Sequence, residues 1–431
     1  MRIGTLPTLA LILALAACSS DDGSSSSKDA GAADGYVDGL FGGDTTQSDS
    51  GSQIKETTCE NAPVSAGQAG SCEVTKTGTS GLFVVGDLLL PGGEVVNSGG
   101  VIIEAGKITC VGCECADKAG EHTWVVCNEA VVSPGLIDAH NHVGWLNGRP
   151  WVAAEAKVDP ALRWEHRHDW RKGKRGNPKI NVTGGGASYD QKAFGELRYV
   201  LTGGTSIFGS GDLSGLMRDL DATGKGDNGL GQPGARYDTF PLGDSSGTQL
   251  DSGCGYGKVP TTPNADAWAP HVAEGIDAAA RNEFLCLSNQ GEGANDTIAS
   301  NVALIHGTGL NATDLALMAA KGSKLIWSPR SNVSLYGETA RVVAAHRVGV
   351  SIGLGVDWLP SGSMNMVREL ACAAYLNDNH WGGYFGDWQL WEMATIGAAR
   401  ALAMDDAVGA LLVGHAGDIA VFRRKSGAPH R

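Results

Sequence analysis

The chain has 431 residues, of which 42% are hydrophobic and 19% charged, a composition typical of a globular protein with a buried core. This length allows roughly two to three domains. The formal net charge of −14 argues against a nucleic-acid binder, because that class of protein needs a basic face.

The first residues have the pattern of an export signal. Arg2 is basic, and Ile3 to Ala17 form an apolar stretch that is too short to span a bilayer. The string Leu15-Ala16-Ala17-Cys18 resembles a bacterial lipobox, in which the cysteine is lipidated and becomes the new N-terminus. The alternative is an ordinary signal peptide with an incidental cysteine. We expect residues 1–18 to be a lipoprotein signal, with Cys18 anchoring the protein to a lipid bilayer.

A polar segment separates this signal from the first hydrophobic runs. Ser19 to Ser52 consist mainly of Ser, Asp and Gly, which cannot bury enough apolar surface to offset the entropy of ordering. Residues 19–58 are therefore expected to be a disordered tether. Because Ser19 is not the aspartate that retains some bacterial lipoproteins at the inner membrane, we expect a cell-envelope location, with outer membrane and periplasm favoured.

The nine cysteines after the lipobox favour disulfides, because an exported protein folds in an oxidising compartment. Cys59 and Cys72 bracket a short loop and are predicted to pair, and Cys254 is predicted to pair with Cys286. Cys372 is predicted to be a buried free thiol.

Four further cysteines lie close together in the sequence. They could form two disulfides in any of three connectivities, or bind a structural zinc ion, which an oxidising compartment disfavours. These residues are Cys110, Cys113, Cys115 and Cys127.

Short β-branched runs predict strands in residues 59–133 and again in residues 404–431. The runs are Phe83 to Val85, Val101 to Ile103, Ile108 to Thr109, Val125 to Val126, Leu411 to Val413 and Ile419 to Phe422.

After Pro134, short apolar runs alternate with helical stretches, which predicts an α/β barrel or a doubly wound sheet. Residues 134–403 suit a (β/α)8 barrel, which takes roughly 250 residues. No convincing fourth strand appears between Leu242 and Trp268. The predicted strands are Leu136 to Ala139, Thr205 to Phe208, Ala235 to Leu242, Val302 to Ile305, Lys324 to Trp327 and Val350 to Leu354. The predicted helices are Gln191 to Leu201, Leu213 to Ala222, Gly275 to Asn282, Thr313 to Lys321, Glu338 to Ala345, Met364 to Leu376 and Trp388 to Ala403.

Residues able to bind a metal recur where these strands should end. His140 and His142 follow an apolar run, and alternation along a strand can point both into one site. His271, His306 and Asp357 follow in chain order. A lone histidine after a strand is more often structural, but four such positions at successive strand ends predict a catalytic site, because the chemistry of parallel barrels lies at these ends.

The segments around these residues resemble the amidohydrolase superfamily, in its cytosine-deaminase-like and chlorohydrolase-like branch. The resemblance covers roughly residues 80–423 and is specific for the superfamily rather than for a substrate. Its segments are Pro134 to His142, His271 to Gly275, Leu304 to Gly307, Trp327 to Asn332, Gly353 to Asp357 and Gly414 to Ile419.

The resemblance implies a TIM-type barrel joined to a small β-sandwich built from both chain ends. It also implies that His140, His142, His271 and Asp357 bind a metal ion. In addition, Glu274 would shuttle protons, His306 would orient or polarise the substrate, and Asp357 would accept a proton from the attacking water. Relatives usually continue with further sandwich strands, so either the sandwich is reduced or the sequence is truncated at its end.

One divalent ion is expected rather than two. Members of the superfamily that bind two ions bridge them with a carboxylated lysine on the fourth strand, and the only lysine between Lys225 and His271 is Lys258, in a loop-like context. Three histidines and a carboxylate suit zinc best, with iron or manganese as alternatives. Such an ion lowers the pKa of its bound water to near neutrality.

The segment from Arg163 to Lys179 is basic in an otherwise acidic chain. Its H-x-H pair, His166 and His168, follows no apolar strand, so we do not expect it to bind metal. One interpretation is a lid that attracts an anionic or carboxylated substrate. The alternative, which we favour, is a solvated helix face.

Three further residues could contact a substrate. Trp145 and Trp358 flank the metal ligands in the sequence and could wall a flat pocket or pack the barrel rim. Asn332 could contact substrate or cap a loop.

The predicted function is hydrolysis of a non-peptide C–N bond in a small molecule, of the deaminase or amidase kind. A chlorohydrolase or dipeptidase would use the same metal chemistry. A non-catalytic, small-molecule-binding lipoprotein is the alternative from another class, and a homo-oligomer is left open.

Overall fold

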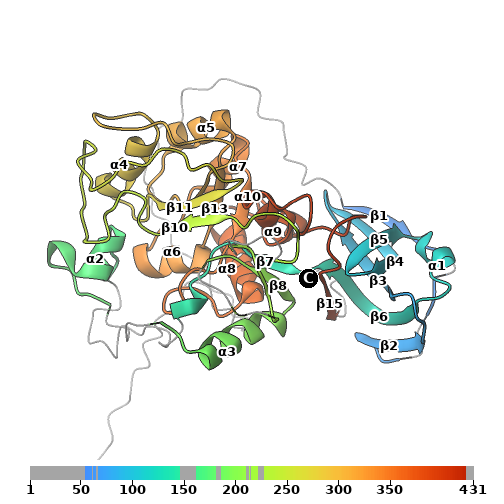
Figure 1. The fold of residues 1–431 in the computed structure, drawn as a ribbon. Helices are drawn as coiled ribbons and strands as arrows, with labels where there is room; N and C mark the ends of the chain where they lie inside the picture. Colours follow the sequence, from blue (N-terminus) through green and yellow to red (C-terminus); the bar gives the residue numbers. More distant parts are fainter. Residues whose placement is uncertain are drawn as a thin grey trace, which may run out of the picture.

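The computed structural model describes residues 54–423, except 61, 65–66, 146–161, 181–185, 210–212, 214 and 222–227. The export signal, the proposed lipidation site Cys18 and residues 19–53 of the predicted tether lie outside the described residues. The prediction that residues 19–58 are all disordered is wrong at its end, because Lys55–Thr58 form a strand that pairs with residues 94–97. No helix in the described ranges is long and apolar enough to cross a membrane. Figure 1 shows a twisted β-sheet on one side and an α/β assembly on the other.

The β-sheet has seven strands and unites both ends of the described chain. Its strand order is β1-β4-β3-β6-β15, with β2 also pairing with β6 and β5 with β4. The strands are β1 (Lys55–Thr58), β2 (Ser71–Lys76), β3 (Leu82–Leu90), β4 (Glu94–Glu104), β5 (Lys107–Gly112), β6 (Thr123–Pro134) and β15 (Ile419–Arg423). Strand β15 pairs antiparallel with β6, so residues almost 300 positions apart lie side by side. The strand predicted at Leu411 to Val413 is absent.

Side chains on both faces of this sheet are buried. Along β3, Val84 and Leu88 contribute to one hydrophobic cluster, whereas Phe83 and Val85 contribute to another. Alternate residues of a strand point to opposite faces, so the near-continuous apolar run of β3 supplies both clusters. The short helix α1 (Cys115–Lys118) joins the second cluster through Cys115.

The disulfides correct part of the predicted pairing. Cys59 bonds to Cys113 and Cys72 bonds to Cys127, so the predicted Cys59–Cys72 pair is wrong. Strands β2 and β6 place Cys72 opposite Cys127. This strand register could not be inferred from the short loop between Cys59 and Cys72, on which the prediction rests. The other bonds join Cys110 to Cys115 and, as predicted, Cys254 to Cys286.

The cysteine cluster and Cys372 also differ from prediction. The four clustered cysteines are all in disulfides, two of them with partners outside the cluster, which leaves no thiolates for a structural zinc ion. Cys372 is buried in helix α8 (Met366–His380) but is not a free thiol.

Two parallel sheets form the centre of the α/β assembly. One has the order β7-β8-β9 and the other β10-β11-β12-β13-β14. The strands are β7 (Leu136–Asp138), β8 (Gly204–Ile207), β9 (Arg218–Asp219), β10 (Arg236–Asp238), β11 (Trp268–Val272), β12 (Ala303–His306), β13 (Lys324–Trp327) and β14 (Ile352–Leu354). Parallel pairing places the carboxyl ends of the strands at one edge, where their following residues meet.

The helices surround these sheets (Figure 1). They are α2 (Arg167–Lys172), α3 (Tyr189–Val200), α4 (Ala278–Leu287), α5 (Ala312–Lys321), α6 (Pro329–Tyr336), α7 (Val342–Arg347), α8 (Met366–His380), α9 (Asp387–Met393) and α10 (Ile396–Ala401). Single-turn 3-10 helices occur at η1 (Val143–Trp145) and η2 (Lys174–Gly176). Helix α5 shows how the sequence sets its bounds: Asn311 and Asp314 form a capping box at its start, and Gly322 ends it in a left-handed conformation.

All six strands predicted after Pro134 overlap observed strands, but β9 and β11 were missed. The helix predicted at Leu213 to Ala222 is wrong, because β9 occupies Arg218–Asp219 and Gly215 has a φ of 98°. Arg218 bonds to both carboxylate oxygens of Asp418 at 2.8 Å, which ties β9 to the residue preceding β15. The predicted helix from Trp388 to Ala403 is divided into α9 and α10. Helices α2 and α6 were not predicted.

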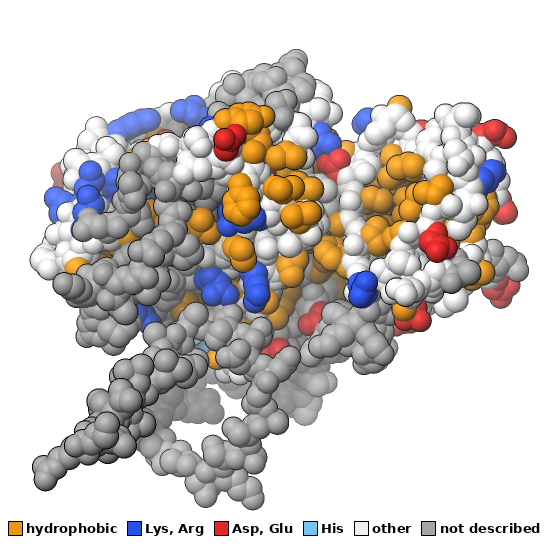
Figure 2. Space-filling model, turned by 90° about the horizontal axis from the view of Figure 1, so that it is seen from below, with side chains coloured by type: hydrophobic (Ala, Val, Ile, Leu, Met, Phe, Trp, Pro, Cys, Tyr) orange, Lys and Arg blue, Asp and Glu red, His pale blue; other side chains and the backbone are white. Residues whose placement is uncertain are grey.

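Helix α3 buries polar residues and exposes apolar ones. Glu196 and Tyr199 are buried, whereas Phe194 and Leu201 are 65% and 76% exposed. The Glu196 carboxylate accepts a hydrogen bond from the Met217 backbone nitrogen. Figure 2, seen from the side on which α3 lies in Figure 1, shows hydrophobic side chains gathered on this face. The hydrophobic pattern alone would therefore orient α3 incorrectly.

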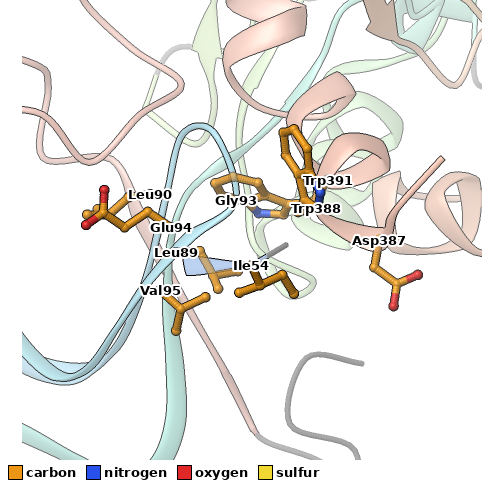
Figure 3. Close-up of a pocket in the computed structure, with 9 residues that line it drawn as sticks. All are labelled: Ile54, Leu89, Leu90, Gly93, Glu94, Val95, Asp387, Trp388 and Trp391. Atoms are coloured by element: carbon orange, nitrogen blue, oxygen red, sulfur yellow. The ribbon is translucent and has the colours of Figure 1, made fainter. Parts of the chain in front are cut away.

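A small apolar groove marks the seam between the seven-stranded sheet and α9. Leu89 and Val95 line it from the sheet, and Trp388 and Trp391 from the helix (Figure 3). The indole nitrogen of Trp391 donates to the Ser133 hydroxyl at 2.9 Å, so the seam also has a polar contact.

We expect the Cys254–Cys286 bond to stabilise the fold more than the Cys110–Cys115 bond. The first bond closes a loop with a sequence separation of 32 residues, and the second bond closes a loop with a separation of 5 residues. Chain-entropy arguments give about 3–4 kcal/mol for the longer loop and about 2 kcal/mol for the shorter one. Denaturant unfolding of the two Cys→Ala double variants tests this, and equal losses would contradict it.

Candidate metal centre and active site

Four predicted metal ligands converge at the carboxyl edge of the parallel strands. The Nε2 atoms of His140, His142 and His271 lie 3.0–3.3 Å from one another. The Oδ1 atom of Asp357 lies 3.5 Å from the Nε2 atoms of both His140 and His142. His140 and His142 follow β7, His271 lies in β11 and Asp357 follows β14, so the structure brings together residues from three strands.

These distances suit a tetrahedral divalent ion. Ligand atoms about 2.0–2.2 Å from zinc are about 3.3–3.6 Å apart in tetrahedral geometry. Three imidazole nitrogens facing one another cannot all be satisfied by mutual hydrogen bonds, because a neutral imidazole has one N–H. A cation at the centre would satisfy all three lone pairs, so the donor set fits a metal.

Burial keeps these histidines neutral. Burial and the neighbouring His271 and His142 hold the pKa of His140 well below its usual range. Burial lowers the pKa of His142 to about 4 and, together with His306 and His142, holds that of His271 well below 6.5. Neutral imidazole is the form that binds metal, so the ligands are ready at neutral pH.

The backbone around the site is strained at three non-glycine residues. Ala273, His306 and Asp357 have φ angles of 57°, 74° and 70°, in the left-handed region. Each such residue costs on the order of 1–3 kcal/mol and persists only where surrounding contacts hold it. All three follow or end parallel strands, where the chain must turn its side chains into the site.

Asp138 ties two of these strand ends together. Its Oδ1 accepts hydrogen bonds from the backbone nitrogens of His140 at 3.2 Å and Val356 at 2.9 Å, and its Oδ2 accepts one from Asn141 at 2.7 Å. Burial raises the pKa of Asp138 to about 7 despite these bonds. The sequence analysis missed this role, although alternation along the strand places Asp138 on the same side as His140.

Hydroxyl groups orient two of the ligands. The Ser328 hydroxyl lies 3.2 Å from Nδ1 of His140, on the side of the ring away from the other histidines. The Ser331 hydroxyl donates to Oδ2 of Asp357, which leaves Oδ1 facing His140 and His142. Such contacts fix the orientation of metal ligands.

Glu274 and His306 lie beside the four ligands, as predicted. Oε2 of Glu274 is 3.5 Å from Nε2 of His306, and both side chains are buried. The Tyr336 hydroxyl donates to Oε1 of Glu274 at 2.8 Å, and the Trp170 indole donates to the Tyr336 oxygen at 2.9 Å. Burial raises the pKa of Glu274, whereas Arg167 and the Tyr336 hydrogen bond oppose that rise.

Asn332 lies behind His306. Its amide nitrogen is 3.1 Å from Nδ1 of His306, and the Asn332 side chain is buried. The structure thus gives Asn332 a contact with a candidate catalytic residue, while its predicted contact with substrate stays a prediction.

A cavity of about 400 Å³ opens onto this group. The predicted substrate contacts Trp145 and Trp358 both line it, and Trp145 is 51% exposed. Trp358 stacks on Trp170 with ring centroids 5.4 Å apart. The full lining is His142, Trp145, Arg167, Trp170, Arg171, Lys179, Ile180, Thr239, Phe240, His271, Glu274, Asp357, Trp358 and Ser361.

The solvated-face interpretation of the basic segment is wrong for its central part. His166, Arg167, His168 and Asp169 are all buried. The Arg167 guanidinium lies 2.6 Å from Asp244, 3.4 Å from Glu283 and 3.9 Å from Glu274, a network that periodicity could not reveal. His166 and His168 contact these carboxylates and not the four metal ligands.

Lys258 is exposed and is absent from the cavity lining. This placement agrees with the prediction that it does not bridge two metal ions.

Comparisons with known proteins agree with the site. Residues 278–428 match the Amidohydrolase family model. A segment of 125 residues is 34% identical to a 5-methylthioadenosine/S-adenosylhomocysteine deaminase of Desulforudis audaxviator, covering 28% of this chain and 29% of that protein. A match to the Halobacterium salinarum protein of the same name is longer but weaker, with 26% identity over 81% of this chain and 85% of that protein.

The match to the Desulforudis audaxviator protein and that to the protein of the same name from Teredinibacter turnerae span only 29% and 27% of the relatives' own length. A zinc-containing adenosine deaminase structure from Xanthomonas campestris superposes with a TM-score of 0.51 and 15% identity, covering 81% of this chain and 86% of that chain. At this identity the likeness concerns the fold alone. Together, the motifs, the site and the comparisons support the amidohydrolase superfamily and an α/β fold of its type.

We expect Gly355→Ala to weaken metal binding. A Cβ at Gly355 would lie 2.6 Å from the backbone nitrogen of His140 and 2.6 Å from its Cβ. The added methyl group must displace His140, at a cost of about 1–3 kcal/mol for such overpacking. Metal content and thermal unfolding measure the effect, with Gly120→Ala as control, because a Cβ there meets nothing within 4 Å. Equal metal content in both variants would contradict the prediction.

Proposed function

We propose that the protein is a metal-dependent hydrolase of a non-peptide C–N bond, and more specifically a deaminase of an amidine-type group in a flat ring. The convergence of three histidines and Asp357 beside Glu274, at the end of a cavity, carries this proposal. Relatives named as deaminases support the reaction, and the aromatic side chains of the cavity support a flat substrate.

One divalent ion, with zinc as first choice and iron or manganese as alternatives, would be held by His140, His142, His271 and Asp357. It would supply a water of near-neutral pKa and polarise the group under attack. Of the four ligands only Asp357 is a carboxyl group, and burial and the neighbouring Glu274 raise its pKa, so it would also accept a proton from the attacking water.

Glu274 is placed to move that proton to the departing nitrogen. It lines the cavity. One of its carboxyl oxygens accepts the Tyr336 hydrogen bond, and the other lies 3.5 Å from Nε2 of His306. Its raised pKa brings the group nearer the operating pH, where a carboxyl can both accept and return a proton.

His306 would polarise or orient the substrate. Burial lowers the pKa of His306 to about 3, so its ring is neutral. With the Asn332 amide donating to Nδ1, the remaining proton lies on Nε2, which faces Glu274 and the metal ligands.

We infer that the eight parallel strands close into one barrel and that the seven-stranded sheet is the sandwich domain of this superfamily. Two backbone contacts outside the two parallel sheets support closure. Asn141 bridges Asp357 in parallel, joining the ends of β7 and β14. The Ala235 nitrogen donates to the Leu220 oxygen at 2.8 Å, joining β9 to β10.

We also propose that the protein is an exported lipoprotein, anchored through Cys18. The lipobox-like string and the polar tether support this, as do disulfides, which persist in oxidising compartments. Globomycin-sensitive processing and [³H]palmitate incorporation, both lost in Cys18→Ala, would test it.

Metal content and ammonia release test the central proposal. Protein expressed from residue 54, so that strand β1 is kept, and purified without chelator should contain about one zinc or iron per chain, because the four predicted ligands surround one point. The His140→Ala/His142→Ala variant should lose this metal, whereas His380→Ala, at an exposed histidine, should keep it. Glu274→Gln should keep the metal and lose at least about a hundredfold in kcat.

The outcomes separate the alternatives. Ammonia release from amino-substituted heterocycles supports a deaminase, whereas release of an amine or of chloride indicates an amidase, dipeptidase or chlorohydrolase. Well-folded protein without bound metal would overturn the proposal and favour a binding role.

Tyr336→Phe should slow the reaction and shift its pH profile. The lost hydrogen bond stabilises ionised Glu274, so its removal raises the Glu274 pKa further. Since a proton acceptor must be ionised, the acid limb of kcat should move to higher pH, with kcat at neutral pH lower by about tenfold. Tyr384→Phe, which removes a hydroxyl bonded to His346, is the control. An unshifted acid limb would contradict the role of Tyr336.

A further inference from the structure

We propose that the cavity selects substrates that carry an anionic group, a carboxylate or a phosphate, beside the reacting ring, and that Arg171 binds this group. The assignment of a reacting ring rests on the proposed function. The recognition of an anion rests on the cavity itself and is tested separately.

Arg171 lies near the end of α2 with its guanidinium held in place. Its Nη1 lies 2.8 Å from Nδ1 of His168, and its Nη2 donates to the Ser245 carbonyl at 3.3 Å. The guanidinium also lies over the ring of Phe240, 4.3 Å from the ring centroid. One contact within α2 and two with the connection between β10 and β11 therefore fix a half-buried cation in the cavity wall.

The hydrogen bonds around Arg171 leave its charge without a counter-ion. His168 accepts from Arg171 through Nδ1 and therefore carries its proton on Nε2, which lies 2.8 Å from Asp244. Asp244 also bonds directly to Arg167, at 2.6 Å. Within the described residues, no carboxylate oxygen lies within 4.0 Å of the Arg171 side chain.

Arg171 differs in this respect from its neighbour Arg167. Arg167 is buried among three carboxylates, whereas Arg171 shares the same surroundings without a direct partner. Burial and the charge of Arg167 lower the pKa of Arg171, which shows that its positive charge is disfavoured where it lies. An anion in the cavity would supply the missing partner through charge-assisted, bidentate bonds.

The rest of the cavity is consistent with an anionic, aromatic ligand. Lys179 is an exposed second cation in the lining and has no ion pair among the described residues. The two carboxylates of the lining, Glu274 and Asp357, face His306 and the histidine ligands. The cavity therefore has acidic groups at its metal end and unpaired basic groups elsewhere, in a protein whose net charge is −14.

Binding of matched naphthalene probes to the metal-loaded protein tests this without turnover. Naphthalene-2-carboxylate, 2-naphthyl phosphate and neutral naphthalene-2-carboxamide share one ring and differ in charge. By isothermal titration, at least one anion should bind more tightly than the amide, and the tighter of the two anions identifies the preferred group. Arg171→Met should weaken that anion about tenfold to a hundredfold and leave the amide unchanged.

Two variants provide controls. Lys172→Met removes an adjacent exposed cation that does not line the cavity, and anion binding should be unaffected. Arg171→Lys keeps the charge and should retain part of the affinity, which separates charge from damage to α2. Thermal unfolding of each variant confirms folding.

The proposal is overturned if neither anion binds more tightly than the amide, or if Arg171→Met leaves anion binding unchanged. The second result would mean that the anion binds the metal or Lys179 only. Metal content and ammonia release are independent of these affinities, so failure of the proposed function and failure of anion recognition are distinguishable.

Discussion

Three imidazole nitrogens and one carboxylate oxygen face a single point in the interior, 3.0–3.5 Å apart. Without a cation, this arrangement leaves buried lone pairs opposed, which is costly in a medium of low dielectric. The surrounding structure must hold it in place. Asp138 joins the ends of β7 and β14, and the backbone at Ala273, His306 and Asp357 adopts left-handed angles that few residues tolerate. The proposed metal centre would explain why the fold keeps a strained backbone at Ala273, His306 and Asp357.

The charged groups around Glu274 are buried because of the same candidate active site. A carboxyl that transfers protons needs a dry environment, but an isolated buried carboxylate is strongly disfavoured. The positive charge of Arg167 favours the ionised form of Glu274 without a close ion pair. Arg167 lies 3.9 Å from Glu274, whereas its closer partners are Asp244 and Glu283. Glu283 in turn accepts from the backbone of Ala273, one residue before Glu274. The first turn of helix α2, Arg167 to Asp169, is thus buried because it delivers a counter-charge, despite the basic sequence of the segment.

The sequence analysis predicted which residues converge, because they lie in or follow short apolar strands, and parallel strands bring such residues to one edge, whereas their role as metal ligands stays a prediction. It failed where partners are set by tertiary contacts. The pairing of Cys72 with Cys127 follows from strand register, and β9 follows from the bonds between Arg218 and Asp418, far apart in the chain. The burial of Arg167 could not be read from a basic run, since its carboxylate partners lie roughly 80 to 120 residues away.

The connection between β7 and α3 supplies much of the cavity beyond the ligands. Trp145, Arg167, Trp170, Arg171 and Lys179 all come from this one segment, whereas the metal ligands come from three strands. Under the proposed function, chemistry and specificity would thus reside largely in different parts of the fold. Changes in a single connection can alter the charge and shape of the cavity while the strand ends keep the metal in place. This division explains why motifs at strand ends indicate the reaction class but not the substrate, which would depend on the side chains that the described parts of this connection place in the cavity.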